Sequence, residues 1–447
     1  MPTLARFVLP ALLLTSVTGC GEGTTPEPPG PPSAIRAVAS PPASVPAGTL
    51  LDSLVARVVD AKGKGVPNVT VTWSPFGGSM AQPRQVVTDA AGNARTAWTP
   101  GTRAGSYEVA ATAVTTAGPV SAVFRTAVMP GPARTVRISP AGLGLRVGEA
   151  RQLTAESWDE YGNVVAGSST VWSSMDESTA SVTAAGSVVG RAPGFTEVTA
   201  RAGSASATAS VTVLSQPPAS LAALRFDGSD DYVQVPDHVL LDAGTGDFTW
   251  EVWLKRSRTD VREDVLSKKD VFADSEHDVV LLIEQDGRAN AFLREFPWRV
   301  PTVIVSSTSR VGTDWTHLAM TRSGGVVRLY VNGVLEGTGM ASFDVSSSGP
   351  FRIGANRINN AGPDASPVFA FSGQVHEVRL WSVSRSNRDI AVGMLHCTPR
   401  GTAGLVGLYR FDQDTGTAAR DVSGNGNDGV LRNGPTWVGG PRRCGAG

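Results

Sequence analysis

Apolar and polar residues alternate in short runs along most of this chain, and clusters of Gly, Pro, Asn and Asp separate the runs. A period of two places successive side chains on opposite faces of a strand, so the pattern predicts half-buried β-strands. In the first third of the chain we expect strands over residues 51–59, 69–73, 94–98 and 107–111. Only a stretch near 386–394 favours a helix, and a short one. The pattern therefore predicts an all-β protein.

One local pattern occurs twice. Asp60, Gly63, Val66 and Trp73 recur at the same offsets as Asp159, Gly162, Val165 and Trp172. A turn of the form Asp-x-x-Gly, followed by a strand that ends in Trp, predicts a hairpin whose indole enters a sandwich core. We therefore expect two similar domains, over residues 35–128 and 132–214.

A Pro- and Ser-containing linker, residues 215–220, ends this pattern, and residues 221–444 form a third predicted domain. A hairpin with a type I′ turn is predicted near Asn332-Gly333. The mostly apolar stretch over residues 326–331 precedes this pair, and two apolar residues follow it. All five histidines and six of the ten tryptophans lie in this domain. We therefore look for functional chemistry here.

The N-terminus has the features of an export signal. Arg6 precedes an apolar stretch over residues 7–17, which is shorter than the roughly 20 residues that span a bilayer. Val17-Thr18-Gly19 leads directly into Cys20, which resembles the bacterial lipoprotein signal. That resemblance implies a signal peptide over residues 1–19, lipidation of Cys20 and a site in the outer membrane of a Gram-negative bacterium. The alternative is a plain secretory signal with an incidental cysteine.

Residues 20–34 are rich in Pro and Gly and have no apolar periodicity, so they predict an extended tether. The formal net charge of the whole chain is −1. This balance gives no electrostatic basis for binding nucleic acid or an anionic membrane, so we expect membrane contact through the lipid alone.

The first two domains resemble bacterial Ig-like domains. VVDAKGKGVPNVTVTW and TDAAGNARTAWTPGTRAGSYEVAATA are similar to the invasin and intimin type, and the second domain, with Gly186, Val188, Gly194 and Val198-Thr199-Ala200, to the second bacterial group. The resemblance implies two β-sandwiches that act as spacers on a cell surface.

The third domain resembles laminin-G-like and concanavalin A-like jelly rolls. Its matching segments are LRFDGSDDYV, FTWEVW, WTHLA, LYVNG, FRIG, FSGQVHEVRLW and GLVGLYRFDQDTGTAARDVSGNGNDGVL, in family order. One departure is His376, where family members commonly have Asp. The resemblance implies a lectin-like sandwich that binds a glycan or a surface protein.

Cys397 and Cys444 remain once Cys20 is acylated. Exported proteins favour oxidised cysteines, so we expect a disulfide that fastens the C-terminal segment. The alternative is a pair of free buried thiols.

A calcium site is a further hypothesis, because jelly rolls of this superfamily often hold Ca²⁺ through the hard oxygen ligands that the ion prefers. The acidic turns and a nearby glutamate give the candidate ligands Asp227, Asp231, Glu377 and Asp421. Asp, Asn and Gly also form tight turns for purely local reasons, and that alternative stays open.

Catalysis finds little support in the motifs. Polysaccharide-cleaving enzymes of this fold carry a Glu-x-Asp-x-x-Glu strand, which is absent, and Glu251 stands between Trp250 and Trp253. The histidines have no zinc-binding spacing. We therefore predict that the protein is not an enzyme.

Ligand binding is expected at a loop instead. Pro297 disfavours a central strand around Phe296, Trp298 and Arg299, so we expect these side chains on a loop, where they either contact a glycan or anchor the loop. The prediction is a surface lipoprotein that presents a lectin-like domain for non-enzymatic adhesion or recognition. The alternatives are a purely architectural assembly protein and a polysaccharide-cleaving enzyme.

Overall fold

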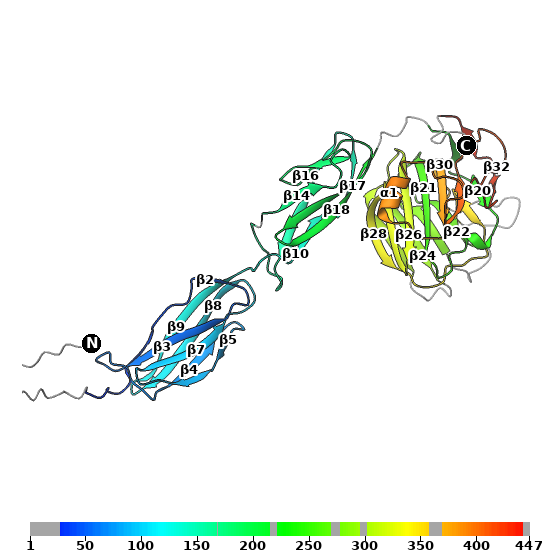
Figure 1. Ribbon diagram of the computed structural model, residues 1–447. Coiled ribbons are helices and arrows are strands. Elements are labelled where there is room, and N and C mark those ends of the chain that lie inside the picture. The colour runs from blue at the N-terminus through cyan, green and yellow to red at the C-terminus, as the bar shows by residue number, and fades with distance from the viewer. Residues whose placement is uncertain are drawn as a thin grey trace, which may run out of the picture. The chain divides into compact units, whose positions relative to one another are not determined.

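The computed structural model describes residues 27–167, 169–214, 221–269, 278–295, 302–356 and 369–440. These residues are nearly all β, as predicted (Figure 1). The chain divides into two compact units, one built mainly on the residues up to Gly131 and the other mainly on those from Pro132 onward. Among the described residues, no helix has the length and apolar character needed to cross a membrane.

The first unit is a β-sandwich. Its strands are Ala34–Ala37 (β1), Ser44–Pro46 (β2), Leu51–Val59 (β3), Thr70–Pro75 (β4), Met80–Gln82 (β5), Gln85–Val87 (β6), Asn93–Thr99 (β7), Gly105–Thr115 (β8) and Gly118–Met129 (β9). One sheet has the order β1-β3-β7-β5 and the other β2-β9-β8-β4-β6. The four predicted strands correspond to β3, β4, β7 and β8, so these predictions are confirmed.

The Asp-x-x-Gly turn forms as expected. The Oδ1 atom of Asp60 accepts the backbone N–H groups of Lys62 at 2.9 Å and Lys64 at 2.8 Å. Gly63 has φ +83°, a conformation that suits glycine because it has no Cβ. The indole of Trp73 is buried, and its ring centre lies 5.4 Å from that of Phe124. The sequence pattern therefore predicted this turn and its core tryptophan correctly. The predicted hairpin is wrong, because the turn leads from β3 in one sheet to β4 in the other.

The second unit begins with a further Ig-like sandwich. Its strands are Thr135–Ser139 (β10), Gly142–Arg146 (β11), Ala150–Gln152 (β12), Thr154–Trp158 (β13), Val171–Ser174 (β14), Ala180–Val182 (β15), Ser187–Gly190 (β16), Gly194–Ala202 (β17) and Ala205–Leu214 (β18). The sheets have the orders β10-β13, β11-β18-β17-β14 and β12-β16-β15. Trp172 packs against this core but is only partly buried, so it is less enclosed than its counterpart Trp73.

The residues from 221 onward form the third domain, which we call the head. Its elements are Ala223–Asp227 (β19), Tyr232–Val235 (β20), Val239–Leu241 (η1), Phe248–Arg256 (β21), Glu263–Lys268 (β22), Asp278–Ile283 (β23), Arg288–Arg294 (β24), Val303–Arg310 (β25), Thr316–Ser323 (β26), Val326–Val331 (β27), Val334–Met340 (β28), Phe351–Ile353 (β29), Ser372–Trp381 (β30), Asn387–Gly393 (α1), Leu405–Tyr409 (β31), Ala418–Ala419 (β32), Gly429–Arg432 (β33) and Thr436–Val438 (β34).

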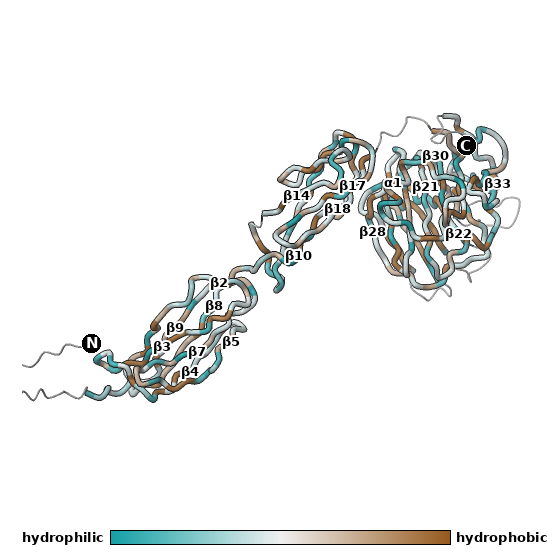
Figure 2. The backbone as a smooth tube through the Cα atoms, viewed as in Figure 1, coloured by the Kyte–Doolittle hydropathy of each residue, from teal (hydrophilic) through white to brown (hydrophobic). Residues whose placement is uncertain are grey.

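Two sheets form the head. The first has the order β28-β27-β26-β21-β30-β19-β34, with β31 paired to β30, and the second has the order β25-β24-β23-β22-β29-β20-β33-β32. Apolar side chains from both sheets, such as Val252 and Leu318 of the first and Leu281 and Ile353 of the second, pack together in one core. Figure 2 shows apolar and polar positions alternating along these strands. Each sheet therefore has an inner, apolar face and an outer face with different chemistry.

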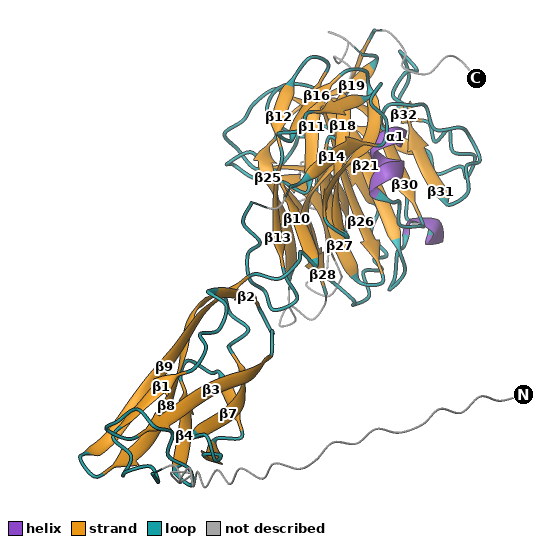
Figure 3. Cartoon of the chain, turned by 60° about the vertical axis from the view of Figure 1, so that its left-hand side comes forward, coloured by secondary structure: helices purple, strands orange, loops and turns teal. Residues whose placement is uncertain are grey.

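The short helix α1 covers part of the outer face of the first sheet (Figures 1 and 3). Ser386 begins it with a capping box, because its side chain accepts the N–H of Asp389 while the Asp389 side chain accepts the N–H of Ser386. Ile390 is fully buried against Ala319 and Tyr330 of this sheet. The predicted helix near residues 386–394 is confirmed.

The predicted Asn-Gly hairpin is also present, between β27 and β28. Asn332 has φ +50° and Gly333 has φ +75°, the left-handed pair that a type I′ turn requires. A Cβ on Gly333 would lie 2.9 Å from the Cα of Ala391 in α1. Glycine therefore serves both the turn and its close approach to the helix.

Candidate functional site

Several predicted functional residues lie outside the described residues. These are Cys20, Phe296, Trp298, Arg299 and Cys444. Cys397 is partly buried and follows α1 closely in the sequence. The lipid anchor, the disulfide and the aromatic loop therefore remain predictions, and the site is built from the described side chains.

The outer face of the second sheet carries a row of side chains that crosses three strands. Asp264 of β22 pairs with Leu282 of β23, and Leu282 pairs with Asn290 of β24. Directly paired residues lie on the same face of a sheet. The neighbours of Leu282, namely Leu281 and Ile283, point into the core, so this row points outward. Strand register thus brings Asp264 and Asn290, 26 positions apart in sequence, to the same face.

Asp264 is fully buried and accepts hydrogen bonds from two side chains. Its Oδ1 atom lies 3.0 Å from Nε of Arg262, and its Oδ2 atom lies 2.8 Å from Nδ2 of Asn356. Burial raises the pKa of Asp264, because it disfavours the charged form, and the nearby charge of Glu284 raises it further. The bonds from Arg262 and Asn356 act in the opposite direction and stabilise the carboxylate.

Two asparagine side chains beside these carboxylates have unsatisfied oxygens. Nδ2 of Asn290 lies 3.4 Å from Oε1 of Glu284. Oδ1 of Asn290 and Oδ1 of Asn356 are buried and have no hydrogen-bond partner among the described residues. Carboxylates only accept hydrogen bonds, so they orient each amide with its NH₂ group toward the acid and its oxygen away. A buried acceptor without a partner costs about 1–3 kcal/mol. Such a cost is tolerable where a ligand supplies the missing donor.

An aromatic side chain borders this row. The ring centre of Phe369 lies 4.3 Å from the Arg262 guanidinium carbon, and the residue is 45% exposed. Its carbonyl accepts the backbone N–H of Asp264 at 2.8 Å. Phe369 has φ +57°, an uncommon conformation for a bulky residue that concentrates at ligand sites. We call Arg262, Asp264, Glu284, Asn290, Asn356 and Phe369 together the acceptor cluster.

The hydrogen bonds of Asp264 bear on what the acceptor cluster can do. A glycosidase needs one protonated carboxyl as a general acid and a second, ionised one. The pKa of Asp264 is raised, but both of its oxygens are already bonded to Arg262 or Asn356. The carboxyl is thus engaged within the protein, and the cluster offers a ligand the asparagine amide oxygens and an aromatic ring.

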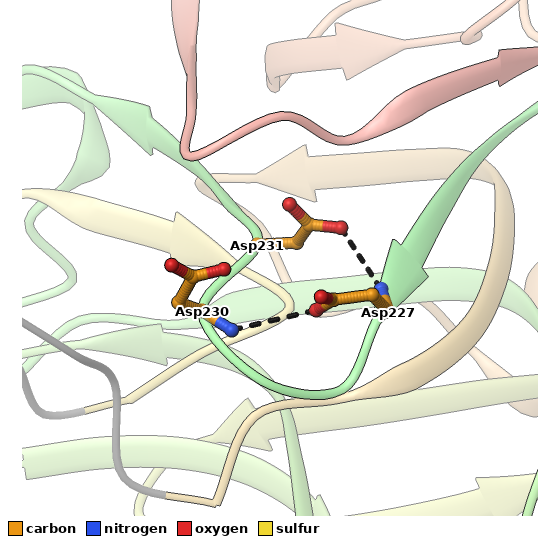
Figure 4. Close-up of side chains that lie close together, drawn as sticks. All are labelled: Asp227, Asp230 and Asp231. Carbon is orange, nitrogen blue, oxygen red and sulfur yellow. Dashed lines mark hydrogen bonds between the residues drawn. The ribbon is translucent and has the colours of Figure 1, made fainter.

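A second acidic group lies in the turn between β19 and β20 (Figure 4). The carboxylate oxygens of Asp227, Asp230 and Asp231 lie within 4.8 Å of one another. The Asp227 carboxylate accepts the N–H of Ser229 at 2.7 Å, and Asp231 accepts the N–H of Asp227 at 2.9 Å. Burial raises the pKa of Asp231, and its two acidic neighbours raise it further. Hydrogen bonds from backbone N–H groups to the aspartate carboxylates thus hold the turn. Carboxylate oxygens are also the type of ligand that Ca²⁺ prefers.

The other two predicted calcium ligands have different partners. Glu377 is buried and forms an ion pair with Arg379 of the same strand. Asp421 accepts the backbone N–H groups of Leu408 at 2.9 Å, Ser423 at 2.8 Å and Asn427 at 3.0 Å. Among the described residues, neither one joins the Asp227 group. Of the four predicted ligands, the structure therefore brings together Asp227 and Asp231, with Asp230 beside them, and calcium binding stays a prediction.

Glu251, which stands alone between tryptophans in the sequence, is the centre of a buried charge network. Its Oε1 atom accepts a 2.7 Å hydrogen bond from the indole of Trp381 and lies 3.6 Å from Nε of Arg385. Its Oε2 atom lies 3.3 Å from Nε2 of His317 and 3.7 Å from the Arg379 guanidinium. Arg379 also donates to the carbonyl of Gly393 at the end of α1. These contacts surround the buried Glu251 carboxylate with an indole and basic side chains. Through Arg379 they also link the first sheet to the helix.

His317 and the core tryptophans have structural positions, as expected. His317 packs against Trp253 with ring centres 5.3 Å apart. Trp250, Trp253, Trp315 and Trp381 are all buried. His376, the departure from the family pattern, is buried with Nδ1 2.7 Å from the carbonyl oxygen of Ala222. Among the described residues, these histidines therefore belong to packing.

The two face-to-face sheets of the head have the architecture of a concanavalin A-like domain. Sequence comparison agrees: residues 227–391 match the family described as the concanavalin A-like lectin/glucanases superfamily. Residues 35–125 match bacterial Ig-like domains of group 1, and residues 132–213 match those of group 2. The chain therefore carries two bacterial Ig-like domains followed by a laminin-G-like, concanavalin A-like domain, in the predicted order. No curated protein matches it.

Solved structures give more distant similarities. A candidate carbohydrate-binding protein from Bacteroides ovatus is 14% identical, with 91% of this chain and 97% of that chain covered and a TM-score of 0.38. A pentraxin from Limulus polyphemus is 16% identical over 49% of this chain and 90% of that chain, with a TM-score of 0.32. The CBM40 module of a Ruminococcus gnavus IT-sialidase, bound to α2,3-sialyllactose, is 12% identical over 38% of this chain and 94% of that chain, with a TM-score of 0.31. Similarity at this level carries no functional information.

Proposed function

We propose that the head binds a glycan without cleaving it. The observation that carries the proposal is the acceptor cluster, in which the buried amide oxygens of Asn290 and Asn356 have no donor within the described part of the chain. They lie beside the Asp264 carboxylate. Sugar hydroxyl groups donate hydrogen bonds, and the apolar C–H face of a sugar ring can pack on an exposed aromatic side chain such as Phe369. A site with a few converging polar groups and an aromatic wall is typical of small-molecule recognition.

The rest of the chain suits display at a cell surface. We propose that Cys20 is lipidated and holds the protein in the outer membrane of a Gram-negative bacterium. Residues 20–34 then form the tether, and the two Ig-like domains act as spacers. The sequence of the signal, which places a cysteine directly after Val17-Thr18-Gly19, supports this proposal. Its biological role is then adhesion or recognition through a glycan or a surface glycoprotein.

Calcium is a further part of the proposal. The turn of Asp227, Asp230 and Asp231 brings three carboxylates together, and burial disfavours the charge of Asp231. A divalent cation would offset this repulsion and fix the turn between β19 and β20. Because Asp227 and Asp231 already hold the turn by backbone bonds, the domain does not depend on the ion for its fold.

A glycan array tests the proposal. The chain from residue 21 onward, produced without its lipid, is applied to the array in calcium and in chelator. We expect binding to a restricted set of glycans. Trp298→Ala tests the predicted aromatic loop of Phe296, Trp298 and Arg299, and a loss of binding would assign that loop to the site. If the folded protein binds no glycan in either condition, the lectin proposal is wrong and the architectural alternative is favoured.

A further inference from the structure

We infer that the acceptor cluster takes a neutral, hydroxyl-rich sugar and discriminates against anionic glycans. This inference rests on the proposed function and adds the class of ligand. The sequence motifs do not indicate it, and the distant structural similarities do not address it. Four features of the outer face of the second sheet support a neutral sugar as the ligand. They are its hydrogen-bonding capacity, its charge, its burial and an exposed aromatic ring.

The hydrogen-bond donors of the acceptor cluster are already engaged within the protein. The amide NH₂ groups of Asn290 and Asn356 already donate to Glu284 and Asp264. The Arg262 guanidinium donates from Nε to Asp264 at 3.0 Å. The oxygens Oδ1 of Asn290 and Asn356 receive no donor from the residues that the structure describes. A ligand that completes this site must therefore donate hydrogen bonds, as a hydroxyl group does and as a carboxylate or sulfate cannot.

The charged side chains of the acceptor cluster give an anionic sugar little to bind. Asp264 and Glu284 are acidic, and the one basic side chain in the cluster, Arg262, is paired with Asp264. Beside the cluster, Arg288 pairs with Asp286 at 3.5 Å. The six residues of the acceptor cluster therefore offer an anionic sugar no cation that lacks an acidic partner.

Asn290 is buried although it lies on the outer face of the sheet. Its exposed fraction is 6%. It belongs to the row with Asp264 that points away from the apolar core. A buried acceptor that lacks a donor lowers the stability of the folded protein. Local cost of this kind is typical of functional sites, where activity and stability oppose each other. Removing the amide should therefore weaken ligand binding while leaving the fold intact or slightly more stable.

An exposed aromatic ring borders the acceptor cluster, as a site for a sugar ring would need. Phe369 is exposed at its border, and its ring is held by the Arg262 guanidinium on one side. Polar acceptors and an exposed ring thus lie within one group of side chains. A bare metal ion would use the acceptors but not the ring, so a requirement for the ring distinguishes a sugar from an ion.

The experiment compares two classes of glycan on the chain from residue 21 onward. Neutral oligosaccharides, such as glucans, galactans, mannans and arabinans, are arrayed beside uronic acid polymers and sialylated and sulfated oligosaccharides. The neutral glycan that binds most strongly is then titrated by calorimetry against the wild type, Asn290→Leu, Asn356→Ala and Phe369→Ala. The matched control is Gln234→Ala, since Gln234 lies on the same face in β20 and contacts Arg432.

We expect neutral glycans to bind, and Asn290→Leu and Asn356→Ala each to lower affinity by about tenfold, the effect of one hydrogen bond to a buried group. Phe369→Ala should also lower affinity, through the loss of ring packing. The control variant should bind like the wild type, and the melting temperature of Asn290→Leu should not fall. Preferential binding of anionic glycans, or neutral binding that survives all three substitutions, overturns the inference while the lectin proposal stands. Binding that requires calcium and is insensitive to Phe369→Ala also overturns it. Failure to bind any glycan overturns both.

Discussion

The indole nitrogen of Trp381 donates a 2.7 Å hydrogen bond to the carboxylate of Glu251, a residue 130 positions earlier in the chain. This bond joins β21 to β30, the two strands at the middle of the first sheet. The same carboxylate lies within 3.3–3.7 Å of His317, Arg379 and Arg385. The outer face of this sheet is therefore held by charge, whereas the inner face is held by apolar packing.

The first prediction concerns the pH dependence of this network. Burial raises the pKa of Glu251, but His317, Arg379 and Arg385 together outweigh it and hold the pKa below its usual value of 4.5. A carboxyl with a lowered pKa adds stability above pH 4.5 and loses that contribution as the pH falls through its folded value. Wild-type stability should therefore fall below pH 4.5, and Glu251→Gln should remove part of this fall.

At neutral pH, Glu251→Gln should cost roughly 3–5 kcal/mol, because it leaves buried arginines without their anion. Urea unfolding of the full chain at neutral and acidic pH measures both effects. The control is Arg288→Gln, which breaks the exposed pair with Asp286 and should cost less than about 1 kcal/mol. Equal costs for the two variants would contradict a structural role for the network.

The second prediction concerns Gly333. Substitution by Ala places a Cβ 2.9 Å from the Cα of Ala391, so the hairpin and α1 must move apart. Gly324 has the same left-handed backbone, at φ +53°, but an added Cβ meets nothing within 4 Å. Gly324→Ala should cost about 1–2 kcal/mol from backbone strain alone, and Gly333→Ala should cost more. Thermal unfolding measures the loss of stability of each variant. Similar losses would show that α1 moves away from residue 333 at little cost in free energy.

The third prediction concerns calcium. If the Asp227 turn binds Ca²⁺, the ion should raise the melting temperature, since a ligand at 100 times its dissociation constant adds about 2.7 kcal/mol. Asp230→Asn should remove this gain without breaking the turn, because the turn bonds are made by Asp227 and Asp231. An identical melting curve in calcium and in chelator would contradict the calcium proposal.

The fourth prediction concerns the predicted disulfide. Cys397 and Cys444 are 47 positions apart, and a bridge across such a loop contributes about 4 kcal/mol in the chain-entropy estimate. Replacing both residues by Ser should lower the stability of the head by up to this amount, and reduction of the wild type should have the same effect. Two thiols that react quantitatively in the unfolded, non-reduced protein would show that no bridge forms.

The fifth prediction concerns the anchor. Expression in a Gram-negative host with radiolabelled palmitate should label the wild type and fractionate it with the outer membrane. Cys20→Ser should abolish the label and release the protein. Cys397→Ser is the matched control and should be labelled normally. Equal labelling of Cys20→Ser would exclude lipidation at this position.

Local patterns predicted much of the fold. The Asp60 turn, the Asn332-Gly333 hairpin and the helix at Ser386 each depend on residues that are close in sequence, and each forms as expected. Buried tryptophans such as Trp250 followed from their place in alternating strands. In each case the physical cause, a cap, a left-handed turn or a period of two, acts over a few residues.

The acceptor cluster could not be predicted in the same way. Asp264 and Asn290 meet through the register of three strands, and Asn356 reaches Asp264 from 92 positions away. Glu251 appeared isolated for the same reason, because its partners lie on other strands. Two of the predicted calcium ligands have other partners, since Glu377 pairs with Arg379 and Asp421 accepts backbone N–H groups. Their acidic side chains carried no sign of these partners in the sequence.

Asp264 holds two described residues to the edge of β22 by different means. Its carboxylate accepts a hydrogen bond from the Asn356 side chain, and its backbone N–H donates to the carbonyl of Phe369. Only the first bond needs the aspartate side chain, since the second is made by the backbone. A substitution of Asp264 should therefore release Asn356 and leave Phe369 in place.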